Sequence, residues 1–246
     1  MAEITVAELV RNGTMSADIA GVLWAAVERR LSYLTVAIPR FAGKSTTSKA
    51  VLALRPPDMP VHRVAGEPEV MARLERERRG GYIFVEEFDH VPMYGYIWGA
   101  PVRRVFQALQ AGYALQTSLH APSVDEGIQA VTHGNGVPDD QAATFKLVLY
   151  IERFGTNLPN FWRRLVDLYE VHAVRDGRPV GQTLYRWESQ GDRFVKAADP
   201  RYFTDASELD DRAGVFRELA STRRTSPEDQ AAALAHYRLH HPRQAS

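Results

Sequence analysis

Residues 33–47 read YLTVAIPRFAGKSTT, and this stretch decides the fold class. Its first six residues form a short apolar run that predicts a buried strand, which Pro39 ends. Gly43, Lys44 and Ser45 follow at the start of a predicted helix. Backbone N–H groups at a helix N-terminus bind phosphate oxygens, and the helix dipole favours the anion. A strand, a loop ending in Gly-Lys-Ser and a helix together predict a phosphate-binding loop.

The side chains of this loop have separate predicted roles. In the pattern G-x-x-x-x-G-K-[ST], the lysine reaches the β- and γ-phosphates and the hydroxyl binds Mg²⁺. Lys44 and Ser45 stand at these two positions, and Pro39, Gly43 and Thr46 complete the predicted nucleotide contacts. The first glycine of the pattern is missing, so the match is partial. An ordinary turn remains the alternative.

Further apolar runs alternate with predicted helices along the first 150 residues. The expected strands cover 33–38, 61–64, 82–85, 114–119 and 146–151. The helices expected between them cover 45–54, 68–79, 102–110 and 123–131. This alternation predicts an α/β fold with a mostly parallel sheet, and right-handed crossovers place helices on both of its faces.

The pattern changes after residue 160. The runs 165–174, 183–188 and 193–196 predict an antiparallel meander with turns at Asp176-Gly177 and Gly191-Asp192, and helices close the chain. The expected organisation has three parts. These are a helical lead-in over 1–32, an α/β core with its meander over 33–200, and C-terminal helices over 201–246.

The composition excludes several classes of function. The 246 residues carry 30 basic and 30 acidic side chains, whereas a protein that coats nucleic acid usually has a basic excess. Cysteine is absent, which excludes disulfide scaffolds, thiolate metal sites and cysteine nucleophiles. No apolar run has the length of a signal or a membrane span, so we expect a cytoplasmic protein. Four of the basic residues are lysines, and Lys44 is one of them.

Two later strands end in residues that suit phosphate chemistry. The run 82–85 is followed at once by Glu86 and Glu87, and an acid at such a strand end orients Mg²⁺ or the attacking water in ATPases. The run 114–119 is followed by His120, which is able to sense a γ-phosphate or orient a catalytic group. The alternatives are two solvated acids at a strand end and a structural histidine.

These motifs occur in the order found in one known family. Gly43 to Thr47, the strand end at Val85-Glu86-Glu87 and the segment 112–121 resemble motor ATPases of type II and type IV secretion and of type IV pili. The strand that opens with Arg163-Arg164 also resembles theirs, and the similarity covers roughly residues 4–200.

The resemblance implies a RecA-like P-loop NTPase that uses ATP and Mg²⁺. It implies that Glu87 and His120 are catalytic and that Ser45 and Glu87 hold Mg²⁺ with the nucleotide. It also implies a hexameric ring and membrane platform proteins of a secretion or pilus system as partners. The expected location is the cytoplasm or the inner face of the membrane, with no transmembrane segment and no direct contact with nucleic acid.

Departures from the family pattern leave three functions open. The family loop is close to G-P-T-G-S-G-K-T, and here Ile38 and Phe41 replace two of its glycines. Of the family's acidic box, only Glu69 in 64–70 matches cleanly. The first interpretation is an active ATPase that drives secretion or pilus assembly. The second is a catalytically impaired partner or regulator of such a motor, and the third is a P-loop kinase or another nucleotide-dependent transferase.

Two weaker features have simple alternatives. His236 and His240 lie at a spacing that suits a metal, although a solvated terminal segment explains them as well. Arg103 and Arg104 are able to act as arginine fingers across a subunit interface, or to form a solvated helix face.

Overall fold

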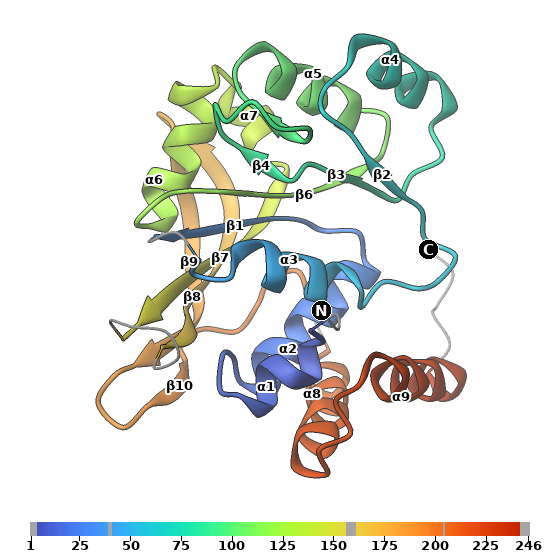
Figure 1. Cartoon of the computed structure of the whole chain (residues 1–246), viewed down its shortest axis with the longest axis vertical. Helices are drawn as coiled ribbons and strands as arrows, with labels where there is room; N and C mark the ends of the chain where they lie inside the picture. The colour runs from blue at the N-terminus through green and yellow to red at the C-terminus, as the bar shows by residue number, and fades with distance from the viewer. Residues whose placement is uncertain (1–3, 39–40, 156–160, 204, 242–246) are drawn as a thin grey trace.

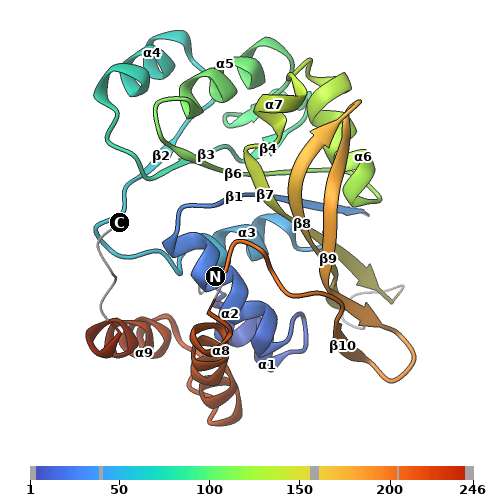
Figure 2. The ribbon, with the colours of Figure 1, turned by 180° about the vertical axis from the view of Figure 1, so that it is seen from behind.

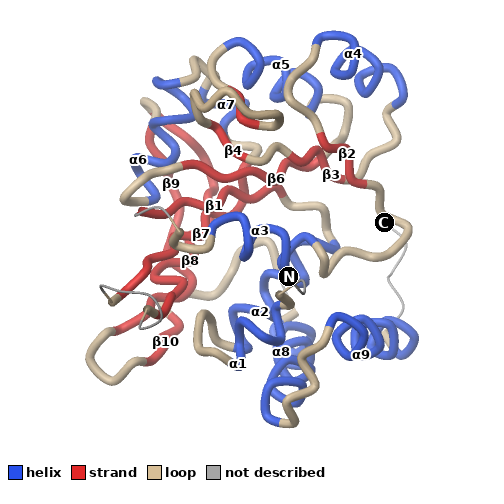
Figure 3. Tube along the Cα trace, viewed as in Figure 1, coloured by secondary structure: helices blue, strands red, loops and turns tan. Residues whose placement is uncertain are grey.

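The computed structural model describes residues 4–38, 41–155, 161–203 and 205–241. Figures 1 and 3 show a central sheet with a layer of helices on each face, and Figure 2 shows the antiparallel strands from behind. Pro39, which was predicted to contact a nucleotide, lies outside the described residues.

The main sheet has eight strands in the order β10-β9-β8-β7-β1-β6-β3-β2. The strands from β7 to β2 in that order run parallel, and β7 to β10 pair antiparallel as a meander. Their bounds are β1 (Ser32–Ile38), β2 (Val61–Arg63), β3 (Tyr82–Phe84), β6 (Ala114–Leu119), β7 (Phe145–Phe154), β8 (Trp162–Arg175), β9 (Arg178–Glu188) and β10 (Arg193–Lys196). This confirms the predicted α/β fold with a mostly parallel sheet and an added antiparallel meander.

The helices form two layers, each with its own apolar core. One layer contains α4 (Pro68–Glu77), α5 (Ala100–Leu109), α6 (Val124–Gln129) and α7 (Asp139–Ala142). The other contains α1 (Val6–Arg11), α2 (Ala17–Glu28), α3 (Lys44–Leu52), α8 (Ala206–Ser221) and α9 (Pro227–His240). Strand β1 serves both cores because its side chains alternate: Tyr33 packs with the α2 and α8 side, and Leu34 and Val36 pack with the α5 and α6 side.

Most element boundaries lie within a few residues of the predictions. The hairpin between β8 and β9 turns at Asp176 and Gly177, which have φ of 51° and 71°, as that dipeptide predicts. The flanking strands are longer than predicted because the pairing continues through 162–164 and 178–182, where tryptophan, proline, glycine and charged residues break any apolar run. Helix α6 ends at Gln129 and continues as the π-helical segment Ala130–Gly134 rather than as regular helix.

A second, smaller sheet lies between β3 and α5 in the chain. The stretch from His90 to Gly99 contains β5 (Tyr96–Ile97), which pairs with β4 (Glu87–Phe88) as a separate small sheet. Strands of two residues are too short to show a periodic pattern, so the sequence gives no sign of them.

The strand order positions the site. Strand β6 lies between β1 and β3, and all three run parallel. Because the carboxyl ends of parallel strands meet at one edge of the sheet, the loop after β1, the acids after β3 and His120 after β6 come together there. Helices from the two ends of the chain also meet, since α1 and α2 both pack on α8. The three-part division of the chain stays a prediction.

Candidate functional site

The loop after β1 has the local geometry of a helix N-terminus built for an anion. Gly43 precedes α3 with φ of 95° and ψ of 16°, a left-handed conformation that glycine adopts without steric cost. The amide of Thr47 already donates to the carbonyl of Gly43, which starts the helix. The amides of the first helical turn before Thr47 therefore point out of the helix end, where a phosphate group is stabilised.

Phe41 occupies a position that glycine would fill more easily. Its φ is 67°, and its side chain is 79% exposed at the mouth of the site. A left-handed conformation costs a residue with a Cβ atom about 1–2 kcal/mol. Ile38, at the other changed glycine position, is the last residue of β1 and pairs in register with Glu152 of β7. The structure therefore concentrates the strain at Phe41.

Lys44, Glu87 and His120 converge at the carboxyl edge of the sheet. The Lys44 Nζ lies 2.9 Å from Nε2 and 3.1 Å from Nδ1 of His120, and 3.4 Å from Glu87 Oε1. Glu87 Oε1 also lies 3.2 Å from His120 Nε2. Lys44 and Glu87 are buried, with 7% and 4% of their surfaces exposed. These predicted residues, which come from three different elements, therefore form one cluster.

The hydrogen bonding inside this cluster is incomplete. Glu87 Oε1 is buried and accepts no well-aligned hydrogen bond among the described residues, although the Lys44 ammonium and the His120 ring lie 3.4 and 3.2 Å away. A buried carboxylate oxygen without a directed donor is costly, so it is uncommon where a group has only a structural role. The arrangement fits a group that turns toward a ligand or a water.

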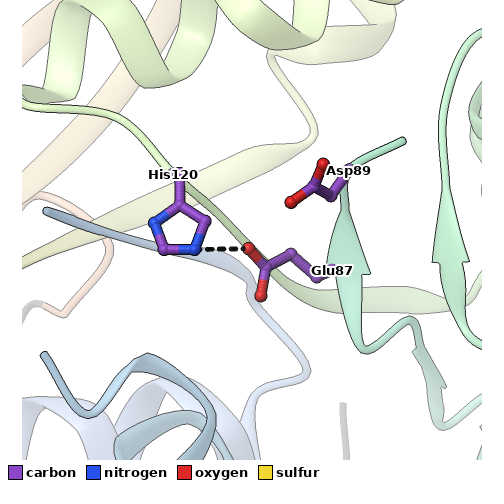
Figure 4. A group of neighbouring side chains, drawn as sticks. All are labelled: Glu87, Asp89 and His120. Carbon is purple, nitrogen blue, oxygen red and sulfur yellow. Dashed lines mark ion pairs between the residues drawn. The ribbon is translucent and has the colours of Figure 1, made fainter. Parts of the chain in front are cut away.

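Asp89 joins this cluster, although the sequence analysis did not select it. One ligand atom from each of Glu87, Asp89 and His120 lies within 4.8 Å of the others, and Figure 4 shows the three side chains around a common space. Glu87 begins β4 and Asp89 directly follows it, and their amides donate to the carbonyls of Gly95 and Ile97. Side chains two residues apart in extended chain point to the same side, which brings the two carboxylates together. The alternation Glu-x-Asp was the signal in the sequence that would have found it.

A cavity of about 420 Å³ surrounds these groups. It contains all the predicted site residues that the structure describes, and several others. Among the described residues, the lining is formed by Phe41, Ala42, Gly43, Lys44, Ser45, Thr46, Glu87, Asp89, Val91, Met93, Tyr96, His120 and Arg163. It combines charged groups with apolar and aromatic side chains. A ligand that carries both phosphate groups and a flat apolar group matches this mixed lining.

The other candidate residues lie elsewhere. Arg103 Nη1 donates to the carbonyl of Asn135 and Arg104 Nε donates to that of Gly66, so both guanidinium groups bind backbone of their own chain. On α9, His240 Nδ1 lies 2.8 Å from the carbonyl of His236. Among the described residues, three possible metal ligands come together only at Glu87, Asp89 and His120.

A second cavity of about 400 Å³ lies over the meander. It contains Asp167 of β8, whose Oδ2 accepts a hydrogen bond from Thr183 Oγ1 at 3.3 Å. Burial raises the pKa of Asp167 to about 6, against the smaller opposing effects of that bond and of Arg186.

Comparisons with known proteins place the chain only loosely. No protein-family model matches it. It is 28% identical over 215 residues to the uncharacterized protein MJ0900 of Methanocaldococcus jannaschii, covering 78% of this chain and 38% of that protein. The chain therefore spans well under half the length of this relative.

Two solved structures share parts of the architecture. The VirB11 ATPase from the Brucella suis type IV secretion system, in complex with sulphate, aligns with a TM-score of 0.42 and 17% identity, over 59% of this chain and 52% of that one. The Legionella pneumophila ATPase DotB aligns with a TM-score of 0.38 and 12% identity, over 80% of this chain and 54% of that one. No helix in the described ranges has the length and hydrophobicity needed to cross a bilayer.

Proposed function

We propose that this chain binds ATP with Mg²⁺ in the cavity beside α3 and hydrolyses it. The observation that carries the proposal is the convergence of Lys44, Glu87 and His120 at the N-terminus of that helix, with distances of 2.9–3.4 Å between their polar atoms. A cation for phosphate, a buried carboxylate for water and a histidine between them are the parts that phosphoryl transfer to water requires.

Binding uses the loop and the helix end. The amides at the start of α3 and the Lys44 ammonium neutralise the β- and γ-phosphate charges, and the apolar and aromatic side chains of the lining accept the base. Met93 and Tyr96 are among these side chains. The charged and apolar groups of the lining together favour a nucleoside triphosphate over an inorganic anion.

The donor set around the loop fits Mg²⁺. The Ser45 hydroxyl and the carboxylates of Glu87 and Asp89 line one cavity, and such oxygen ligands are the ones that Mg²⁺ prefers. When bound, the ion would offset the charge that develops on the transferred phosphoryl group. Lys44 lies 3.4 Å from Glu87 Oε1 and opposes a second cation there until a phosphate draws its ammonium away.

This exchange of partners gives Glu87 its proposed catalytic role. With Lys44 engaged by phosphate, the Glu87 carboxylate loses a neutralising cation and is able to accept a proton from the attacking water. His120 Nε2, 3.2 Å from the same oxygen, orients that carboxylate and reports the presence of the γ-phosphate. Nucleotide binding and base activation are therefore coupled through one ammonium group.

The work that hydrolysis performs is proposed from the family resemblance of the motifs. We infer a motor of the secretion or pilus type that acts as a hexameric ring on membrane platform proteins, in the cytoplasm or at the inner face of the membrane. Both solved structures described above are ATPases, and one of them belongs to a type IV secretion system.

A second function is favoured by the strain at Phe41. A loop with a left-handed phenylalanine in place of glycine fits a protein that binds nucleotide without efficient turnover and regulates a partner motor. Calorimetry with a non-hydrolysable ATP analogue, together with phosphate release from Mg-ATP, separates the candidates: binding with turnover supports the ATPase, and binding without turnover supports the regulator. A transferase would release little inorganic phosphate and would form ADP and a phosphorylated product once an acceptor is added.

The decisive experiment compares two lysines of α3. Release of inorganic phosphate from Mg-ATP is measured for wild type, Lys44→Ala and Lys49→Ala. Lys49 is the matched control because it pairs with Glu86 at 3.0 Å and does not line the cavity. We expect Lys44→Ala to abolish turnover and Lys49→Ala to retain it. Equal rates for wild type and Lys44→Ala would refute the ATPase proposal.

A further inference from the structure

Arg163 reaches the phosphate loop from the meander. It is the second residue of β8, and its Nε and Nη2 both donate to the carbonyl of Phe41, at 3.2 and 3.1 Å. The two residues are 122 positions apart in the chain. A guanidinium group that directs two of its donors to one carbonyl restrains the direction as well as the distance of that peptide group.

The Arg163 side chain also covers Gly43. A Cβ atom on Gly43 would lie 2.8 Å from Arg163 Cδ and 2.9 Å from its Nε, which is closer than such atoms approach in proteins. Gly43 therefore has two reasons to be glycine: its φ of 95° and the arginine that lies against it. One side chain contacts the loop on both sides of Ala42.

Arg163 is itself held by its neighbours. Its guanidinium carbon lies 4.6 Å from the centre of the Phe161 ring, a cation–π contact. Arg153, its partner in the β7–β8 register, approaches the same ring at 5.9 Å. Burial and, secondarily, the charge of Arg153 lower the pKa of Arg163, whose guanidinium stays charged at neutral pH.

We propose that Arg163 is a positioning residue that holds the phosphate loop in its binding conformation. The loop lacks two of the glycines of its pattern, and Phe41 is left-handed against its own preference. The carbonyl that Arg163 holds belongs to this same residue. The contact therefore restrains the residue whose backbone is strained. It replaces the conformational preference that glycines at positions 38 and 41 would supply. This inference rests on the proposed nucleotide site.

Two other roles make different predictions. If Arg163 bound the γ-phosphate directly, its loss would weaken the binding of ATP much more than the binding of ADP. If it supplied only positive charge to the cavity, lysine would replace it. A residue that positions the loop affects the binding of ATP and ADP alike, because both place a β-phosphate against the same amides. Lysine would not replace it, because lysine lacks the planar guanidinium group that donates two hydrogen bonds to the carbonyl.

The test measures dissociation constants for Mg-ATP and Mg-ADP by calorimetry, using wild type, Arg163→Gln, Arg163→Lys and Arg153→Gln. Arg153→Gln is the matched control because it removes an equal charge beside Phe161, and Arg153 does not line the cavity. We expect Arg163→Gln to raise the dissociation constants of both nucleotides by the same factor, about tenfold. Arg163→Lys should behave like Arg163→Gln, and Arg153→Gln should stay within about twofold of wild type.

Other outcomes overturn the inference in recognisable ways. Unchanged affinities for Arg163→Gln refute any role in binding, a loss confined to ATP indicates direct γ-phosphate contact, and full rescue by Arg163→Lys indicates a charge effect. A wild type that binds neither nucleotide instead refutes the proposed function.

A measurement without nucleotide tests the loop itself. Hydrogen exchange of the amides of residues 42–47 should be about tenfold faster in Arg163→Gln than in wild type, with the melting temperature and the exchange of α2 unchanged. Equal exchange rates in the loop would refute positioning, and faster exchange throughout the chain would show a general loss of stability instead.

Discussion

Two buried glutamates, each close to basic side chains, differ in how they are bonded. Glu28 of α2 accepts from Arg238 Nε at 2.6 Å, from Trp24 Nε1 at 2.8 Å and from Arg212 Nη2 at 2.9 Å. Glu87 Oε1 lies 3.2 Å from His120 Nε2 and 3.4 Å from Lys44 Nζ, and it accepts no well-aligned hydrogen bond among the described residues. A glutamate with basic neighbours therefore forms a fully hydrogen-bonded structural cluster at Glu28. At Glu87 it leaves a carboxylate oxygen available to a ligand.

The Glu28 cluster ties three helices together. Its arginines come from α8 and α9, and the Arg212 guanidinium also lies 4.5 Å from the Trp24 ring centre. Burial alone would raise the pKa of Glu28, but the charges and hydrogen bonds of Arg212 and Arg238 outweigh it and lower that pKa. The stability from this pairing is present above the ordinary pKa of a glutamate and is lost as the pH falls through the lowered one.

The largest expected effect comes from removing an arginine from the Glu28 cluster. Arg212→Ala leaves Glu28 buried without one of its two arginine partners, so we expect a loss of about 3–5 kcal/mol in the free energy of unfolding. Denaturant unfolding measures it. Arg217→Ala on the same helix is the control, because its ion pairs with Asp18 and Asp210 are exposed and should contribute less than about 1 kcal/mol. Equal losses for the two variants would contradict the comparison.

The site around Glu87 should respond in rate rather than in stability. Glu87→Gln keeps the shape of the side chain but removes the base, so we expect Mg-ATP turnover to fall by about 100-fold or more with nucleotide affinity retained. Glu86→Gln is the control, since Glu86 pairs with Lys49 and Arg63 and does not line the cavity. Turnover unaffected by Glu87→Gln would remove Glu87 from the mechanism.

Asp167 extends the comparison to a carboxylate without a close cation in the described residues. Because burial raises its pKa to about 6, the folded state binds more protons than the unfolded state between about pH 4 and 6, and stability falls as the pH rises through that window. Asp167→Asn should be more stable than wild type at pH 7.5, by on the order of 2 kcal/mol, with the difference vanishing near pH 4. A pH-independent difference would contradict this assignment.

The smallest expected effect is that of Phe41→Gly. Relief of the left-handed conformation is worth about 1–2 kcal/mol, and the added freedom of glycine in the unfolded chain offsets about 0.5–1 of it. We therefore expect a stability gain below about 1 kcal/mol and an unchanged affinity for Mg-ATP, measured by thermal unfolding and calorimetry. A weaker affinity would show that the Phe41 ring contacts the ligand.

Much of the fold follows from local patterns in the sequence. The parallel strands are short apolar runs between helices, and the meander turns carry Asp-Gly or Gly-Asp. Lys44, Ser45 and Glu87 were selected because they stand at strand ends in the order of a known motif, and they line one cavity with His120. A strand end specifies an edge of the sheet, and this is enough to bring such residues together.

The remaining parts of the site depend on contacts that no local pattern encodes. Asp89 enters the cluster because β4 and β5 form a two-residue pairing. Arg163 was selected only as part of the start of a strand. Because the chain has 26 arginines, being an arginine does not distinguish it as a site residue. Its contact with the loop depends on the register of β8 against β7, which sequence periodicity does not fix.

The central position of β1 has a consequence for how the protein is made. Both neighbours of β1 come from later in the chain, and the Leu115 amide reaches Ser32 Oγ across 83 residues. During synthesis the phosphate loop therefore leaves the ribosome long before either wall of its cavity exists. Contacts between residues so far apart in the chain form slowly, and the apolar strand β1 stays unpaired until β6 and β7 have been made. We expect this strand to be a main binding site for chaperones on the nascent chain.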